Sequence, residues 1–82
     1  MEPYPNPAST QLTLPVVVPE NNNLTIDLYN SLGQKVKNIY SNIINKGLQL
    51  IAIDLSDLET GVYVFKTEFS GEFIYKRVII NN

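Results

Sequence analysis

The sequence predicts an all-β domain, an Ig-like antiparallel β-sandwich of six to seven strands, on three observations. Apolar and polar residues alternate in Leu24–Tyr29, which is the period of a strand with one buried face. Short apolar or alternating runs follow along the whole chain, and clusters of Asn, Gly and Ser separate them. No segment has the length and period of an amphipathic helix. Many short strands at close spacing favour a sandwich over an α/β arrangement.

Six segments of the chain are expected to form strands. They are expected at Gln11–Val18, Leu24–Tyr29, Val36–Ile44, Leu48–Leu55, Val62–Phe69 and Phe73–Ile80. Pro15 cannot donate a backbone hydrogen bond, so it should split the first run or mark an edge strand. The side chains expected to be mostly buried, because they fall on apolar alternations next to turns, are Leu28, Ile53, Leu55, Leu58 and Tyr63.

One short segment has a helical signature. Ser56–Glu59 has the S-x-x-E form of a capping box, in which side chains satisfy the first backbone N–H groups of a helix. Thr60 and Gly61 follow at once. We therefore expect a single helical turn that crosses from one sheet to the other.

The last hairpin has two possible registers. A two-residue turn at Ser70 and Gly71 would place Tyr63 opposite Val78. A three-residue loop with Gly71 in a bulge would place Tyr63 opposite Arg77 instead. A shift of one residue moves every side chain of a strand to the other face, and local sequence does not choose between the two.

Length and composition narrow the classes of function. The 82 residues suit one small domain, with residues 1–9 as a junction and residues 10–82 as the sandwich. The net charge is −2, and Lys76-Arg77 is the only basic pair, so nucleic acid is not an expected partner. No apolar run approaches the ~18 residues of a membrane span, so direct membrane insertion is not expected.

The sequence lacks the residues that most enzymes use. It contains neither histidine nor cysteine, which excludes Ser-His-Asp and Cys-His arrangements and the common zinc sites. Asp54 and Asp57 are the nearest carboxylate pair, and a strand end and a capped turn explain them better than catalysis does. The glycines are isolated turn residues rather than a phosphate-binding loop. We expect no enzyme, no metal site and no cofactor.

The aromatic residues leave one alternative open. Tyr29, Tyr63 and Phe65 are expected to pack between the sheets, where a buried ring contributes a few kcal/mol. If rings instead lined one exposed sheet face, the domain would be an Ig-like adhesion module that binds glycans or proteins.

Four separated motifs carry a resemblance to a known family. They are Tyr4–Ser9 followed by Leu12, then Ile26–Val36, Ile53–Tyr63 and Lys76–Asn81. In order and spacing they resemble the type A C-terminal sorting domain of the type IX secretion system of Bacteroidetes. The motif positions expected to have structural roles are Pro5, Asn6, Pro7, Tyr29, Gly33, Asp54, Leu58, Gly61 and Tyr63. The prolines make the first motif stiff and extended, while Gly33 and Gly61 should need a positive φ or a close backbone approach.

The resemblance implies a secretion signal without catalytic activity. Such a domain follows an N-terminal cargo domain, passes through the periplasm, and is read by the outer-membrane type IX translocon. A sortase-like peptidase then removes it, at or before Tyr4, and the cargo is released or anchored at the cell surface. The expected recognition surface consists of Lys76, Arg77, Val78 and Ile80, together with a strand edge near the C-terminus.

Overall fold

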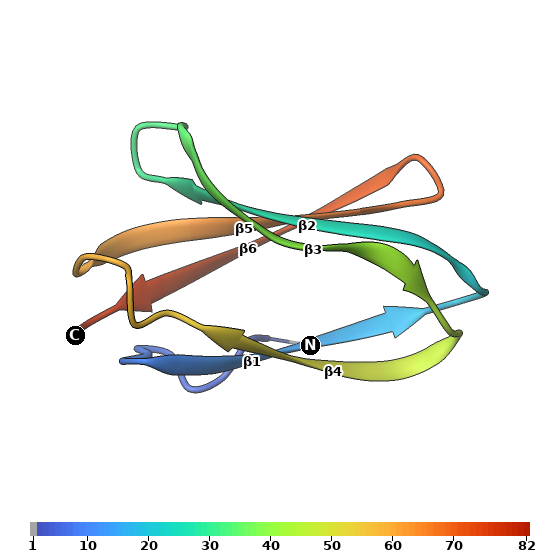
Figure 1. Cartoon of the computed structure of the whole chain (residues 1–82), viewed down its shortest axis with the longest axis horizontal. Coiled ribbons are helices and arrows are strands. Elements are labelled where there is room, and N and C mark those ends of the chain that lie inside the picture. The colour runs from blue at the N-terminus through green and yellow to red at the C-terminus, as the bar shows by residue number, and fades with distance from the viewer. Residues whose placement is uncertain (1) are drawn as a thin grey trace.

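The domain is a sandwich of two antiparallel sheets, seen in a computed structural model that describes residues 2–82 (Figure 1). The six strands are β1 (Gln11–Val18), β2 (Asn22–Asn30), β3 (Lys35–Ile44), β4 (Gly47–Asp54), β5 (Gly61–Phe69) and β6 (Glu72–Ile80). β1 pairs with β4 in a two-stranded sheet, and the second sheet has the order β3-β2-β5-β6. The described residues contain no helix, and the all-β prediction is confirmed.

The core lies between the sheets and follows the alternation of the strands. Leu24, Ile26 and Leu28 of β2 are fully buried, and Phe65 of β5 lies opposite Leu28 on the same face. Of the five side chains expected in the core, four are buried and Leu58 is half-buried at its edge. The same alternation corrects the expectation for Tyr29. This residue follows Leu28 directly, so its ring is on the outer face of the four-stranded sheet, half-exposed opposite Val64.

Pro15 does not interrupt β1, so the expected split is wrong and the edge-strand alternative is confirmed. Thr13 exchanges two backbone hydrogen bonds with Tyr4, of 2.8 and 2.9 Å, on the side of β1 away from β4. Pro15 is two residues further on, so its nitrogen points to that same side. Its missing N–H therefore removes no bond between β1 and β4.

The segment Ser56–Glu59 contains no helix and overlaps a β-turn over Leu55–Leu58, so the expected helical turn is wrong. The Leu58 N–H donates to the Leu55 carbonyl at 3.0 Å, and the Ser56 N–H donates to Asp54 Oδ1 at 2.9 Å. Asp54, at the end of β4, thus takes the capping role that the sequence pattern assigned to Ser56. The segment does carry the chain from β4 in one sheet to β5 in the other, as expected.

The last hairpin has the two-residue turn. Phe69 pairs with Glu72, and Tyr63 pairs with Val78. Ser70 and Gly71 have φ values of 52° and 74°, as a type I′ turn requires. This register turns Val78 and Ile80 toward the core and Arg77 toward solvent.

The two glycines of the family motifs differ in their conformation. Gly33 has a φ of 80°, in the turn where its N–H donates to the Asn30 carbonyl at 3.0 Å. Gly61 has no positive φ, and a Cβ built there would lie 3.6 Å from the Tyr63 ring, which is an ordinary contact. The expected requirement for glycine, through a positive φ or a close backbone approach, therefore holds for Gly33 and not for Gly61.

Candidate recognition surface

The residues before β1 form a strap, defined here as Tyr4–Ala8, that joins the two sheets. Tyr4 bonds to Thr13 of β1, as described above. At the other end of the strap, the Ala8 N–H donates to the Ile79 carbonyl at 2.8 Å, and the Ala8 carbonyl accepts from the Asn81 N–H at 2.7 Å. Ala8 is buried. The strap is not the extended junction predicted from its prolines, because it bends, with cis peptide bonds before Pro5 and Pro7. Met1 of the predicted junction lies outside the described residues.

Asn6, in the middle of the strap, bonds to β6 through its side chain. Its Oδ1 accepts the Ile79 N–H at 3.0 Å, and its Nδ2 lies 3.4 Å from the Arg77 carbonyl. The side-chain amide therefore supplies the donor and the acceptor that a neighbouring strand would offer to β6. Pro5 and Pro7, which lack an N–H, flank it on both sides.

The structure separates the four residues predicted to form the recognition surface. Val78 and Ile80 have no exposed surface, because the register of β6 directs them into the core. Their side chains do not belong to a surface of the folded domain, and the prediction is corrected for these two. Arg77 is exposed on the outer face of the four-stranded sheet. Lys76 lies at the rim between the sheets, with 24% of its side chain exposed.

Lys76 forms an ion pair with Glu2, which precedes the strap. Its Nζ lies 2.6 Å from Glu2 Oε2. The hydrogen bond from Lys76, and then its positive charge, hold the pKa of Glu2 below the usual value of 4.5. The pair is at the surface, where an ion pair contributes little to stability but does orient its two side chains.

The outer face of β6 carries exposed aromatic residues beside Arg77. Phe73 and Tyr75 alternate with the inward residues of β6, and Tyr75 is 62% exposed. Lys66 Nζ of β5 lies 4.8 Å above the centre of the Phe73 ring, within the range of a cation–π contact. A shallow groove on the same face is lined by Tyr29, Val64, Lys66 and Tyr75, among others. Sequence reasoning omitted Phe73 and Tyr75, although they share the odd-numbered alternation of Arg77.

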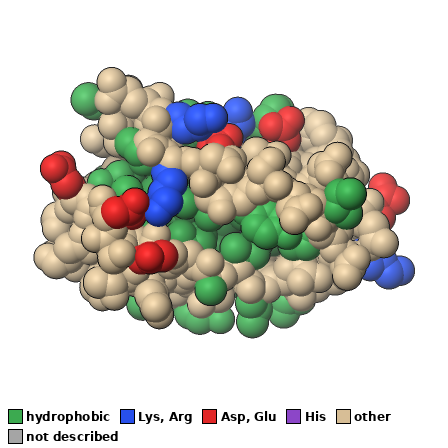
Figure 2. Space-filling view, in the orientation of Figure 1, with side chains coloured by type: hydrophobic (Ala, Val, Ile, Leu, Met, Phe, Trp, Pro, Cys, Tyr) green, Lys and Arg blue, Asp and Glu red, His purple; other side chains and the backbone are tan. Residues whose placement is uncertain are grey.

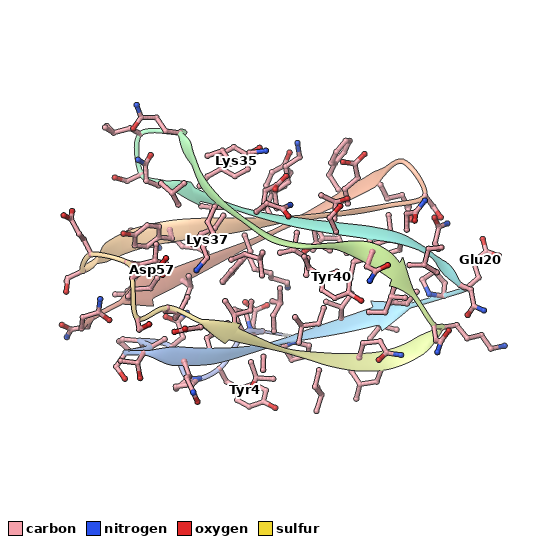
Figure 3. All side chains as sticks on the ribbon, in the orientation of Figure 1. Tyr4, Glu20, Lys35, Lys37, Tyr40 and Asp57 are labelled. Carbon is pink, nitrogen blue, oxygen red and sulfur yellow. The ribbon has the colours of Figure 1, made fainter. Side chains whose placement is uncertain are left out.

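The remaining motif residues form the connection between β4 and β5. Hydrogen bonding from Ser56 holds the pKa of Asp54 below its usual value of 3.8. Lys37 of β3 reaches across to this connection, 3.1 Å from Asp57 Oδ1 and 3.3 Å from the Asp54 carbonyl (Figure 3). Tyr63 Oη donates to the Glu59 carbonyl at 2.7 Å. The carboxylates of Asp54 and Asp57 thus both have hydrogen-bond partners within the fold.

Within residues 2–82, no three side chains of the metal-ligating types come together. The same part of the chain contains no helix long and apolar enough to cross a membrane.

Comparison with known proteins identifies the family. The family model of the secretion system C-terminal sorting domain matches residues 2–81. No curated protein matches the chain. The family match gives no support to the adhesion-module alternative, although Phe73 and Tyr75 are exposed. Domains of this family are signals attached to a cargo, which the type IX machinery recognises and delivers to the cell surface or the extracellular space. The chain belongs to the C-terminal sorting domains of the type IX secretion system.

Proposed function

We propose that the outer-membrane translocon of the type IX system reads this domain in the periplasm, at the C-terminal end of a cargo protein. A sortase-like peptidase then removes the domain, and the cargo is released or anchored at the cell surface. The domain catalyses no step of this process. The family match over residues 2–81 is the observation that carries the proposal.

The position of the strap is compatible with removal of an intact domain. A cut at or before Tyr4 would leave Asn6 and Ala8 bonded to β6. The two sheets would stay joined, and the peptidase would not need to unfold the sandwich.

The proposed contact surface consists of Arg77 and the exposed part of Lys76. Both residues lie beside the strap, near Glu2 and Asn6. Arginine is favoured at protein interfaces because its planar group makes several directed hydrogen bonds. Val78 and Ile80 would act indirectly, by fixing β6 in the core.

Export of a reporter tests the proposal. Residues 2–82 are fused behind a reporter targeted to the periplasm, in a bacterium with a type IX system. The reporter is expected outside the cell, and its retention in the periplasm would contradict the sorting function. Replacing Lys76 and Arg77 by Gln should lower export about tenfold or more, since truncating a central interfacial Arg often costs ~2 kcal/mol.

A matched pair controls for the loss of charge. Lys35→Gln with Lys37→Gln removes the same charge from β3, away from β6. This variant should be exported normally. Thermal melting of both variants establishes that they are folded. Normal export of the folded Lys76/Arg77 variant would show that these two side chains are not read.

A further inference from the structure

Three of the four edge strands carry a feature that discourages pairing with another chain, and β4 does not. Charged residues, proline, bulges and covering segments are the usual protections of a sheet edge. β3 has Lys35, Lys37 and irregular pairing with β2, while β6 has Lys76 and Arg77 and is partly covered by the strap. β1 has Pro15 and the strap. β4 has neither charge nor proline over residues 47–53.

The backbone of β4 is available for pairing along this edge. Thr13 bonds to Tyr4 on the side of β1 away from β4, so the even-numbered residues of β1 make the bonds to β4. Their partners in the register are odd-numbered, as in Leu14 opposite Ile51. Leu48, Leu50 and Ala52 therefore direct their N–H and C=O groups to the free edge of β4.

An uncharged groove lies beside this edge, between β4 and β3. Its volume is about 490 Å³, and its lining combines apolar side chains such as Tyr40, Ile43 and Ile51 with the polar Asn45 and Gln49. Figure 2 shows hydrophobic side chains in a hollow between the two layers, on the face where Figure 3 places Tyr40. The strand segments that flank the groove, residues 39–45 and 47–53, contain no charged residue. Charges lie only at its ends, with the Lys37–Asp57 pair at one and Lys46 in the turn at the other.

We propose that the β4 edge and this groove are a docking site for an extended segment of the export machinery. The segment adds as a strand to residues 48–52 and directs every second side chain into the groove. Charge complementarity defines its chemistry. Its inward residues are uncharged, and an acidic residue faces Lys46, for which the described residues show no ion pair. The inference rests on the proposed function, because that function supplies the partner.

A second copy of the chain fits this site less well. Pairing β4 with its own copy would align two neutral edges. However, the inward side chains of that copy, including Ile51 and Ile53, already pack in its own core. They would leave the groove unfilled, whereas an extended segment brings free side chains to fill it.

Two substitutions at the edge test the site against a matched control. Leu48→Lys places a charge at the free edge, and Val17→Lys places the same charge directly opposite, on β1. The two native side chains are 55% and 58% exposed on the same outer face, so the substitutions differ in the edge that they affect. Leu50→Pro removes an N–H from the free edge only, as Pro15 does on the other edge of the sheet.

With the reporter assay described above, Leu48→Lys and Leu50→Pro should lower export about tenfold or more, a change worth ~1.4 kcal/mol. Val17→Lys should be exported normally, and all three variants should remain folded by thermal melting. If the unaltered domain is exported and both edge variants are exported equally well, the docking site is wrong while the sorting function stands. Equal loss in all three variants would also overturn the site, and failure of the unaltered domain would overturn the sorting function itself.

Amide exchange and sedimentation of the purified domain provide a readout other than export. The N–H groups of Leu48, Leu50 and Ala52 should exchange rapidly, while those of Gln49 and Ile51 should be protected by β1. The domain should sediment as a monomer. Protection of the edge amides together with a dimer that Leu48→Lys dissociates would assign the edge to a second copy, contrary to the proposal.

Discussion

Asn6 and Asp54 hold two irregular segments to the sandwich by accepting backbone hydrogen bonds. Asn6 Oδ1 accepts from Ile79, and Asp54 Oδ1 accepts from Ser56. A hydrogen bond of this kind makes a modest contribution to stability, which is larger when the acceptor is charged. The two acceptors differ in their response to pH, because Asp54 loses its charge in acid and Asn6 has none to lose.

The protonation of Asp54 should therefore appear in the acid stability of the domain. Its pKa is lowered in the folded state, so the carboxylate stabilises the fold above about pH 4, and this contribution is lost as the pH falls through the folded pKa. Asp54→Asn should be less stable than the unaltered domain near neutral pH, and it should lose less stability on acidification. Urea unfolding at a series of pH values measures both effects, with Glu20→Gln as an exposed control. Parallel pH curves for Asp54→Asn and the unaltered domain would contradict this role.

The β5–β6 hairpin depends on its two-residue turn, because that turn sets which side chains of β6 are buried. Gly71 has a φ of 74°, whereas Gly61, at the start of β5, has no positive φ. Substituting alanine at Gly71 and at Gly61 therefore compares the same change at a position with a positive φ and at one without. The side chains that depend on the turn include Val78 and Ile80 in the core and Arg77 on the surface.

Gly71→Ala should lower the free energy of unfolding by about 1–2 kcal/mol, the cost of a left-handed conformation for a residue with a Cβ. For a domain of this size the melting temperature should fall by roughly 4–8 °C per kcal/mol. Gly61→Ala should have little effect, since its Cβ would make only an ordinary contact with the Tyr63 ring. Calorimetry of the two variants provides the comparison. Equal melting temperatures would show that the turn does not require glycine.

In the molecule as a whole, the strap closes one side of the sandwich and the opposite side stays open. The strap bonds to β1 at Tyr4 and to β6 at Asn6 and Ala8. On the other side, Lys37–Asp57 is the only ion pair among residues 2–82 that links β3 to the connection after β4. The closed side faces the cargo connection, and the open side is the proposed docking site.

Deletion of residues 1–8 should therefore destabilise the domain far more than Asn6→Ala does. The deletion removes buried Ala8 and the backbone bonds of both strap ends, from a domain whose total stability is expected to be only ~4–12 kcal/mol. Asn6→Ala should cost roughly 0.5–1.5 kcal/mol and speed amide exchange mainly at Ile79. The deletion should also expose the amides of Thr13 and Asn81. Unchanged exchange at all three amides after the deletion would show that the strap does not close the sandwich.

Local patterns were enough to predict much of this domain. Alternation over Leu24–Tyr29 and the spacing of turn residues identified the strands, because the period of a strand appears directly in its sequence. The four motifs indicated the family for a similar reason, since they preserve an order along the chain. The crossing turn after β4 was located correctly, but its hydrogen bonding was assigned to Ser56 instead of Asp54.

The tertiary structure decided everything that depends on which segments meet. Alternation shows that two faces of a strand differ, but the hairpin register decided that Val78 and Ile80 are buried while Arg77 is exposed. The docking of the strap joins residues more than 70 positions apart, such as Asn6 and Ile79, and no local pattern records such a contact. The free edge of β4 is likewise decided by the tertiary structure. Its uncharged sequence suits an interior strand equally well, and only the arrangement of the two sheets leaves it without a neighbour.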